Sequence, residues 1–509
     1  MTIRNLEKLF APQSIALIGA SKRPGSVGAV LAENLFGGGF DGPVMPVNPK
    51  HRSIQGVLTF ETVASLPLVP DLAVIATPPA TIPGLIAELG AKGTKAAVVI
   101  TAGLGERGDD GASLRQAMLD AAKPHLLRIV GPNCLGTLVP GLGLNASFAH
   151  LSPKPGKLAF VAQSGAVVTS VLDWATSRGI GFSHLVALGD MSDVDFGDML
   201  DDLANDPGTS AILLYIEAIT DARKFMSAGR AAARMKPVVV VKAGRHPEGA
   251  RAAASHTGAL AGADDVYDTA FRRAGMLRVI HLEELFDAVQ TLGLIKPPSG
   301  DRLAIVTNGG GVGVMATDAL MDHGGELAEL SPETIADLDR HLPPTWSRTN
   351  PVDIIGDAPP ERYAHAMTAV TSDAGVDAVL AINCPTAVTT PEAAGEAVIG
   401  AIGKSKLPIL TSWLGDGAAR PARQAFADHM VPTFETPEDA VSAFMQLVTY
   451  RRNQATLMET PASMPEAFEP DVTTAKRLIE EALAAGKAWL NEPSAKALME
   501  AYDIPTAKT

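Results

Sequence analysis

Residues 14–28 read SIALIGASKRPGSVG: an apolar run ends in a turn of small residues, and a helical pattern follows. The same succession returns as KLAFVAQSGAVVTSV at 157–171 and as RLAIVTNGGGVGVMA at 302–316. Strand, small-residue turn and helix, in that order, form the repeating unit of doubly wound α/β domains. The three copies therefore predict three domain starts, near residues 1, 155 and 300.

Further apolar runs rich in Val, Ile, Leu and Ala alternate with longer helical patterns along most of the chain. Runs of this kind are typical of strands that are buried on both faces of a parallel sheet. The predicted fold class is α/β, with three doubly wound parallel-sheet domains, one Rossmann-like and two flavodoxin-like. We expect strands at 14–18, 71–76, 96–100, 158–162, 211–216, 237–241, 303–307, 376–382 and 408–412.

The second and third units share more than their opening turn. Each contains a strand that follows a proline, KPVVVVKAG at 236–244 and LPILTSWLG at 407–415, and each closes on a similar segment, at 279–292 and 433–447. This indicates an internal duplication, although the residues in between match poorly. We expect domains at 1–150, 151–298 and 299–455, then a linker (placed at 453–470), a helix at 472–485 and the opening of a further unit within 456–509.

The composition narrows the functional classes. The 509 residues carry a formal net charge of −14, which argues against a nucleic-acid-binding surface. Two cysteines, far apart in the sequence, provide neither a disulfide framework nor a zinc-ligand cluster, and we expect no metal site in this chain. The N-terminus lacks the apolar core of a signal peptide, and no apolar run approaches the roughly 18 residues of a membrane span. We expect a soluble cytoplasmic protein with no membrane or nucleic-acid partner.

The first turn is typical of a phosphate-binding loop, because small residues let backbone N–H groups approach a phosphate and the helix start favours negative charge. It lacks the strict G-x-G-x-x-G spacing, and Lys50 stands where an NAD site would carry an acidic residue. Cations here suit a phosphorylated ribose or a pyrophosphate; the alternative is a tight turn that serves packing only. The candidate ligand-binding residues are Gly19, Ser21, Lys22, Arg23, Gly25, Ser26 and Lys50.

Three more loops follow predicted strands of the first domain. In open parallel sheets the ligand crevice lies outside the carboxyl ends of the strands, so a long ligand draped across this edge would meet all three loops. The alternative explanation is that these are ordinary loop residues, since Gly, Pro and Asn are common in turns. The candidates are Thr77 and Pro78 in the first loop, Ile100, Thr101 and Ala102 in the second, and Asn133 in the third.

His256 lies in ARAAASHTGALAGAD, residues 250–264, among small residues that offer little to pack against. A lone histidine is usually structural, but neutral imidazole is a competent nucleophile near pH 7, and a loop of small residues would let it move. Glu217, at the end of the run AILLYIEA, is a candidate to fix the tautomer of the imidazole. A strand-end carboxylate that faces water is the alternative explanation for Glu217.

Two turns present backbone donors at a helix start, where the helix contributes roughly half a positive charge. A phosphoryl group of about −1.5 to −2 charge would be held between two such ends. Together with the histidine loop, the pair predicts a phosphoryl-transfer site. The two turns are Gln163, Ser164, Gly165 and Ala166 in the second unit, and Asn308, Gly309, Gly310 and Gly311 in the third.

In its order of motifs the chain resembles the nucleoside-diphosphate-forming acyl-CoA synthetases, relatives of succinyl-CoA synthetase. The resemblance covers essentially residues 1–460 and rests on IGASKRPGSVG, VNPK, ATPP, ITAGLGE, GPNCLG, AQSGAVV, YIEA, SHTGALAG and TNGGGVGV. It implies that residues 1–150 bind CoA, that His256 is phosphorylated with Glu217 as its partner, and that the turns at Ser164 and Gly310 hold phosphate. The implied reaction joins a small carboxylic acid to CoA at the expense of ATP, through an acyl phosphate, and a homo-oligomer is expected.

Two departures from the family pattern bear on these expectations. Asp190 stands where relatives usually carry asparagine, in a region that faces the acyl substrate. This departure leads to the hypothesis that the chain uses an unusual carboxylic acid as its substrate. The tail at 490–509, LNEPSAKALMEAYDIPTAKT, resembles the opening of an ATP-grasp domain, which would supply the sites for ATP, ADP and Mg²⁺. We therefore expect a fused enzyme that is cut short before its nucleotide site.

Other functions compete with this one. A CoA-binding regulatory module of a protein acetyltransferase would share these domains, but relatives of that kind often lose the histidine that SHTGALAG keeps. A superfamily member could instead use transient CoA activation for another conversion of the acid. A nicotinamide oxidoreductase is disfavoured by the cations at the first turn.

Overall fold

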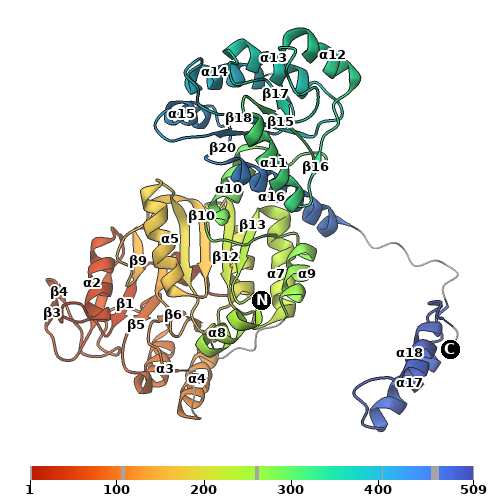
Figure 1. The fold of residues 1–509 in the computed structure, drawn as a ribbon. Helices are drawn as coiled ribbons and strands as arrows, with labels where there is room; N and C mark the ends of the chain where they lie inside the picture. The colour runs from red at the N-terminus through yellow and green to blue at the C-terminus, as the bar shows by residue number, and fades with distance from the viewer. Residues whose placement is uncertain (1–2, 105–108, 258–262, 404, 460–468, 508–509) are drawn as a thin grey trace. The chain divides into compact units, whose positions relative to one another are not determined.

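The structure is a computed structural model of the chain, and it describes residues 3–104, 109–257, 263–403, 405–459 and 469–507 (Figure 1). The side chains of 109–110 and 253–257 also lie outside this description. The chain forms two compact units, residues 1–457 and 458–509. Three larger, mainly parallel sheets with flanking helices build the first unit, which confirms the predicted α/β class.

The first sheet consists of β1 (Ile15–Ile18), β2 (Val44–Val47), β5 (Leu72–Ile75), β6 (Ala96–Val99) and β7 (Arg128–Val130), beside a small hairpin of β3 (Ser53–Ile54) and β4 (Val57–Leu58). The five strands are parallel in the order β2-β1-β5-β6-β7. Phe60 adds a parallel bridge to Val47 beyond β2. Counted as a reduced strand, this bridge completes the order 3-2-1-4-5-6 of dinucleotide-binding Rossmann folds.

Helices cover both faces of this sheet: α1 (Glu7–Phe10), α2 (Val27–Gly37), α3 (Ile82–Lys92) and α4 (Asp109–Ala122), with the short turns η1 (Pro79–Thr81) and η2 (Lys123–His125). Successive strand residues point to opposite faces. Ile15 and Leu17 accordingly join the core that contains α1 and α2, whereas Ala16 and Ile18 join the core beneath α3 and α4.

The second sheet consists of β8 (Gly136–Val139), β9 (Leu144–Ser147), β10 (Pro155–Ala162), β11 (Phe182–Ala187), β12 (Ala211–Ile216), β13 (Val238–Lys242) and β14 (Leu277–Val279), with η3 (Pro140–Leu142) in the β8–β9 turn. Its order is β14-β13-β12-β10-β11-β8-β9, and β8 and β9 are its antiparallel edge. The expected domain boundary after residue 150 therefore comes too late, because residues 136–147 already pair with the second sheet.

Helices of the second sheet are α5 (Gly165–Ser177), α6 (Phe196–Asn205), α7 (Ala222–Met235), α8 (Pro247–Thr257), α9 (Asp264–Arg273) and α10 (Glu284–Leu294). The sequence interpretation put His256 in a loop, and this is wrong for its backbone, since α8 runs to Thr257. Alanine is the strongest helix former, so the Ala-rich segment before His256 extends the helix. The loop expected around His256 continues into residues 258–262, which lie outside the described residues.

The third sheet consists of β15 (Arg302–Thr307), β16 (Glu326–Leu327), β17 (Val352–Asp353), β18 (Ala378–Asn383), β19 (Ile409–Trp413) and β20 (Thr433–Phe434). Its main path, β16-β15-β18-β19-β20, repeats the arrangement β11-β10-β12-β13-β14 of the second sheet, strand for strand. This shared order supports the duplication inferred from sequence. Its helices are α11 (Gly310–Asp322), α12 (Pro332–His341), α13 (Pro360–Thr371), α14 (Pro391–Ile402), α15 (Arg420–Asp428) and α16 (Pro437–Met458).

The linker expected at 453–470 begins too early, because α16 continues to Met458. Asn453 and Gln454 hold this part of α16 in place by donating to the backbone carbonyls of Met276 and Gly275, at 2.7 Å each. The second unit contains α17 (Val472–Ala484) and α18 (Glu492–Glu500), which confirms the predicted helix at 472–485. Among the described residues, no helix combines the length and the apolar content that crossing a membrane would require.

Candidate active site

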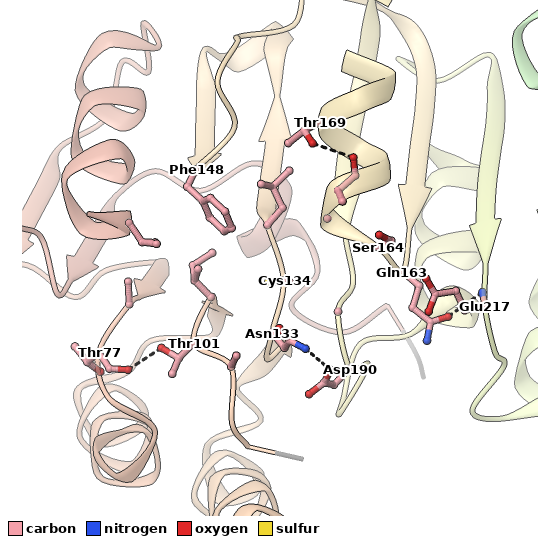
Figure 2. A pocket seen from close by; sticks show the side chains of 18 residues that line it. Thr77, Thr101, Asn133, Cys134, Phe148, Gln163, Ser164, Thr169, Asp190 and Glu217 are labelled. Atoms are coloured by element: carbon pink, nitrogen blue, oxygen red, sulfur yellow. Dashed lines mark hydrogen bonds between the residues drawn. The ribbon is translucent and has the colours of Figure 1, made fainter. Parts of the chain in front are cut away.

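A cavity of about 630 Å³ opens where the carboxyl ends of the first and second sheets face each other. Figure 2 shows Thr77 and Thr101 on the side of the first sheet, and Gln163, Ser164 and Glu217 on the side of the second. The predicted residues that line the cavity are Thr77, Ile100, Thr101, Ala102, Asn133, Gln163, Ser164, Gly165, Ala166, Asp190 and Glu217. Candidates from two expected sites, one for CoA and one for phosphate, thus share one cavity.

Hydrogen bonds join the loops on the first sheet's side. The Thr101 hydroxyl donates to the carbonyl oxygen of Thr77 at 2.7 Å, and the Asn133 N–H donates to the carbonyl oxygen of Thr101 at 3.0 Å. A Cβ on Gly19 would lie 2.3 Å from the carbonyl oxygen of Ala76, so the first turn can come this close to the loop only because residue 19 is glycine. These contacts give the cavity a fixed wall of small and polar residues.

On the second sheet's side, Gln163 holds Glu217 in place. Its Oε1 accepts hydrogen bonds from the backbone N–H groups of Glu217 (3.1 Å) and Ala218 (2.9 Å), so it ties the end of β10 to the end of β12. Both side chains are buried, with Glu217 8% exposed. The alternative explanation of Glu217, a strand-end carboxylate facing water, does not fit this burial.

Helix α5 starts at the same wall. Ser164 has an extended backbone, Gly165 begins the helix, and Gly165 and Ala166 line the cavity. The first N–H groups of a helix have no partner within the helix and carry its positive dipole end. An anion in the cavity would therefore find backbone donors at this turn.

Asp190 joins the walls of the two sheets. Its Oδ1 accepts from the Asn133 side-chain amide at 3.2 Å, and its N–H donates to the carbonyl oxygen of Pro132 at 3.0 Å. The loop approaches so closely that a Cβ on Gly189 would lie 2.2 Å from the same carbonyl oxygen. The Asp190 carboxylate thus lies at the junction between the walls of the two sheets, where Figure 2 shows it facing Asn133.

Several lining residues were not predicted. They are mostly apolar. Leu135 and Phe148 flank the β8–β9 hairpin, and no local sequence pattern predicts that this hairpin pairs with the second sheet. Cys134 is buried, and burial raises the pKa of its thiol to about 12, which keeps it protonated and unreactive at neutral pH. The unpredicted lining residues are Val27, Ala76, Cys134, Leu135, Phe148, Thr169 and Gly189.

The Gly-rich turn adjoins the cavity through Val27 but is not itself part of its described lining. Within the turn, the Ser21 hydroxyl accepts from the Arg23 N–H at 3.0 Å, and the Ser26 hydroxyl donates to the Arg23 carbonyl at 2.7 Å. Asn48 links the turn to Lys50: its amide donates to the Ala20 carbonyl, and its Oδ1 accepts from the Lys50 N–H. The predicted residues outside the lining here are Gly19, Ser21, Lys22, Arg23, Gly25, Ser26, Lys50 and Pro78, and the Lys22, Arg23 and Lys50 side chains are exposed.

The turn of the third sheet repeats the arrangement of the second. Asn308 accepts from the Cys384 N–H at 2.7 Å and donates to the Cys384 carbonyl at 2.9 Å, so it ties the end of β15 to the end of β18 as Gln163 ties β10 to β12. Asp353 lies close to the helix start, because a Cβ on Gly310 would be 2.6 Å from its Oδ2. Of the predicted pair of turns, only Gln163–Ala166 belongs to the cavity lining that the structure describes; Asn308, Gly309, Gly310 and Gly311 do not.

The side chain of His256 lies outside the described residues, but the next described helix, α9, is firmly held at its start. Arg278 binds both carboxylate oxygens of Asp264, the first residue of α9, at 2.6 and 2.8 Å. The Lys242 ammonium lies 4.5 Å from the centre of the Tyr267 ring, and burial lowers its pKa. The start of α9 is therefore anchored to β13 and β14.

Family models match three successive parts of the chain. Residues 13–140 match a CoA binding domain, 155–292 a succinyl-CoA ligase like flavodoxin domain, and 303–468 a ligase-CoA domain. These matches coincide with the three sheets of the first unit.

Curated relatives cover nearly the whole chain. Acetate–CoA ligase [ADP-forming] I of Archaeoglobus fulgidus is 38% identical over 99% of this chain, which spans 71% of that protein. The α subunit of acetate–CoA ligase [ADP-forming] I of Pyrococcus furiosus is 36% identical over 89% of this chain and 99% of its own length.

A solved structure agrees with these relatives. The dinucleotide forming acetyl-coenzyme A synthetase 1 of Ca. Korarchaeum cryptofilum, in complex with phosphate and ADP, is 36% identical and superposes with a TM-score of 0.80. The match covers 90% of this chain and 99% of that one.

Proposed function

The chain belongs to the family of ADP-forming acetate–CoA ligases, and from this premise we propose that it forms acyl-CoA through an acyl phosphate and a phosphohistidine at His256. The family's overall reaction converts a carboxylic acid, ATP and CoA into acyl-CoA, ADP and phosphate. Several relatives are named as acetate–CoA ligases, one as a 4-hydroxybutyrate–CoA ligase and one as a trans-feruloyl-CoA synthase. The proposal therefore does not specify which carboxylic acid this chain uses.

We propose that CoA binds along the first sheet. The loops at Thr77, Thr101 and Asn133 line a cavity with room for a pantetheine arm and an acyl group. Exposed cations beside the Gly-rich turn, at Lys22, Arg23 and Lys50, would meet the phosphates of the nucleotide end.

Written from acyl-CoA towards the free acid, which is the reverse of synthesis, the proposed chemistry has two steps on this chain. A phosphate oxygen attacks the thioester carbonyl of acyl-CoA, the C–S bond breaks, and CoA leaves as a thiolate that takes up a proton. A ring nitrogen of His256 then attacks the phosphorus of the acyl phosphate and releases the carboxylate of the free acid. The first N–H groups of α5 would stabilise the phosphoryl oxygens, and Glu217 would accept a hydrogen bond from the other ring nitrogen.

The last transfer, to ADP, would take place on an ATP-grasp domain that also binds Mg²⁺, of which we propose 490–509 to be the opening. The third-sheet turn at Asn308–Gly311 is proposed as the second phosphate-holding helix start. Cytoplasmic location and a homo-oligomeric state stay predictions.

One observation carries the proposed chemistry: a buried Glu217 lies at the same wall of the cavity as the start of α5. We test it with the chain as it is, incubated with acetyl-CoA and radioactive phosphate. We expect an acid-labile, base-stable phosphoryl label on the protein, and we expect His256→Ala to abolish it.

His246→Ala is the matched control, because His246 is exposed and immediately precedes α8. This variant should keep the full label. Equal labelling of the wild type and His256→Ala would contradict the phosphohistidine. CoA binding without any label would favour the alternative, a regulatory CoA-binding module.

A further inference from the structure

Three side chains capable of binding a metal ion gather on the third domain, away from the cavity. Asp337 and His341 project from α12 and His365 from α13, and one ligand atom from each lies within 4.8 Å of the others. No metal site was expected from the sequence, because that expectation was based on the two cysteines. The ligands of this cluster are an aspartate and two histidines. None of the three belongs to the cavity lining that the structure describes.

The spacing of the ligand atoms suits a small transition-metal ion. His365 Nε2 lies 3.1 Å from Asp337 Oδ2. Two ligand atoms of a tetrahedral zinc ion, each bonded at about 2.0–2.1 Å, lie roughly 3.3 Å apart. An ion can therefore replace the shared proton of this pair with little movement of either group.

The remaining polar atoms of the cluster already have partners that would orient the ligands. His341 Nδ1 lies 2.9 Å from the carbonyl oxygen of Asp337, which leaves Nε2 as its ligand atom. Arg340 donates to Asp337 Oδ1 at 2.6 Å, which leaves Oδ2 as the ligand atom of the carboxylate. Bound histidines and carboxylates in metal sites are held by outer hydrogen bonds of this kind.

The scaffold is fixed while the ligands stay accessible. Asp337 and His341 are four residues apart and so share one face of α12. Their neighbours Leu338 and Tyr363 are fully buried in one core, which anchors both helices. The ligand side chains of Asp337, His341 and His365 are 32%, 46% and 31% exposed, so an ion can enter from solvent.

The two imidazole rings lie face to face, with their centres 3.6 Å apart and their planes tilted by 30°. An ion bound in the planes of both rings needs a wider separation. To provide it, His341, the most exposed of the three, has to rotate outward and give up the hydrogen bond of its Nδ1 to the carbonyl oxygen of Asp337.

We propose that Asp337, His341 and His365 bind one zinc-class ion, such as Zn²⁺, Co²⁺ or Ni²⁺, which clamps α12 to α13. Two imidazoles and one carboxylate suit such ions, whereas Mg²⁺ and Ca²⁺ prefer oxygen ligands throughout. Solvent would fill the remaining coordination position. The clamp is independent of the acyl-transfer chemistry.

The test titrates the chain, without an affinity tag, with Co²⁺ and follows the visible absorption of the bound ion. We expect one site that Zn²⁺ displaces, with affinity lowered at least tenfold in Asp337→Asn and in His365→Ala. His429→Ala is the matched control, since its Nδ1 bonds the carbonyl oxygen of its own helix at 2.9 Å in the same way, and it should bind as the wild type does.

A stability measurement covers the case in which a variant folds poorly. With Zn²⁺ about 100-fold above its dissociation constant, the folded-to-unfolded ratio should rise about 100-fold in the wild type and not in His365→Gln. Unchanged Co²⁺ binding in His365→Ala would overturn the proposal. A thiolate-to-cobalt absorption band would overturn it as well, because it would place the ion on a cysteine.

Discussion

Gln163 and Asn308 were correctly predicted to lie in turns at the ends of strands. The hydrogen bonds that their side chains make were not predicted. Both were predicted to hold phosphate through small-residue turns. In the structure each side chain bonds the backbone just beyond the neighbouring strand, at Glu217 and Ala218 in one sheet and at Cys384 in the other. Such bonds cross between segments far apart in sequence, so the sequence predicts the turn and cannot predict the partner.

A prediction follows for Gln163. Replacing it with leucine removes the acceptor for two buried N–H groups and frees the end of β12 that carries Glu217. A hydrogen bond of this kind contributes about 1 kcal/mol, which corresponds to about fivefold in rate, so we expect a roughly fivefold lower kcat. The KM for CoA should stay unchanged, because the loops at Thr77 and Thr101 are untouched. Steady-state kinetics of acyl phosphate formation measure both.

The matched control is Gln116→Leu. Gln116 is exposed on α4, and its side-chain amide donates to the Asp120 carboxylate at 2.9 Å. This variant should keep the wild-type kcat. A Gln163→Leu enzyme with normal kcat and a raised KM for CoA would show that Gln163 serves CoA binding instead.

At the scale of elements, all nine predicted strands are present within a few residues, because each is built around an apolar run. β11 (Phe182–Ala187) was missed, since Ser183 and His184 interrupt its apolar pattern. Both are buried: Ser183 bonds Thr209 at 2.7 Å, and the His184 ring meets the edge of Phe10. Local patterns do not reveal that distant residues will enclose polar side chains within a strand.

The helix α6 carries a carboxyl group that gives the fold a pH dependence. Burial, with the nearby charges of Asp206 and Glu7, raises the pKa of Asp202 from 3.8 to about 6. A group whose folded pKa is raised destabilises the fold when it ionises, so stability falls as pH rises from about 4 to about 6 and then levels off. The cost above pH 6 is at most about 3 kcal/mol.

We therefore expect Asp202→Asn to raise the urea midpoint at pH 7.5 and to have a much smaller effect near pH 4, where the carboxyl is protonated in the folded state and about half protonated in the unfolded state. Asp318→Asn, an exposed change on α11, should leave the midpoint nearly unchanged at both pH values. Equal stabilisation by Asp202→Asn at both pH values would mean that the ionisation of Asp202 is not the cause.

At the scale of the whole first unit, charged side chains fasten the first sheet to the second. Arg128, on β7, pairs with Asp193 at 3.0 Å and with Asp198 at 3.1 Å. Asp198 also pairs with Lys224 at 2.6 Å and is 1% exposed. The cavity lies between the same two sheets, and β7 leads directly into the loop of Asn133, so this network helps to set the width of the site.

Replacing Arg128 with alanine leaves Asp198 buried with Lys224 alone and leaves Asp193 without its guanidinium. Removing one partner of a buried ion pair costs about 3 kcal/mol, which should appear as a lower urea midpoint. The KM for CoA should rise as well, because the Asn133 loop loses its anchor. Arg420→Ala provides the contrast: Arg420, the first residue of α15, forms an exposed pair with Asp416, which precedes this helix, and exposed pairs contribute little. If the two variants were equally stable, the junction between the sheets would rest on its shared apolar core, and the ion network would be dispensable.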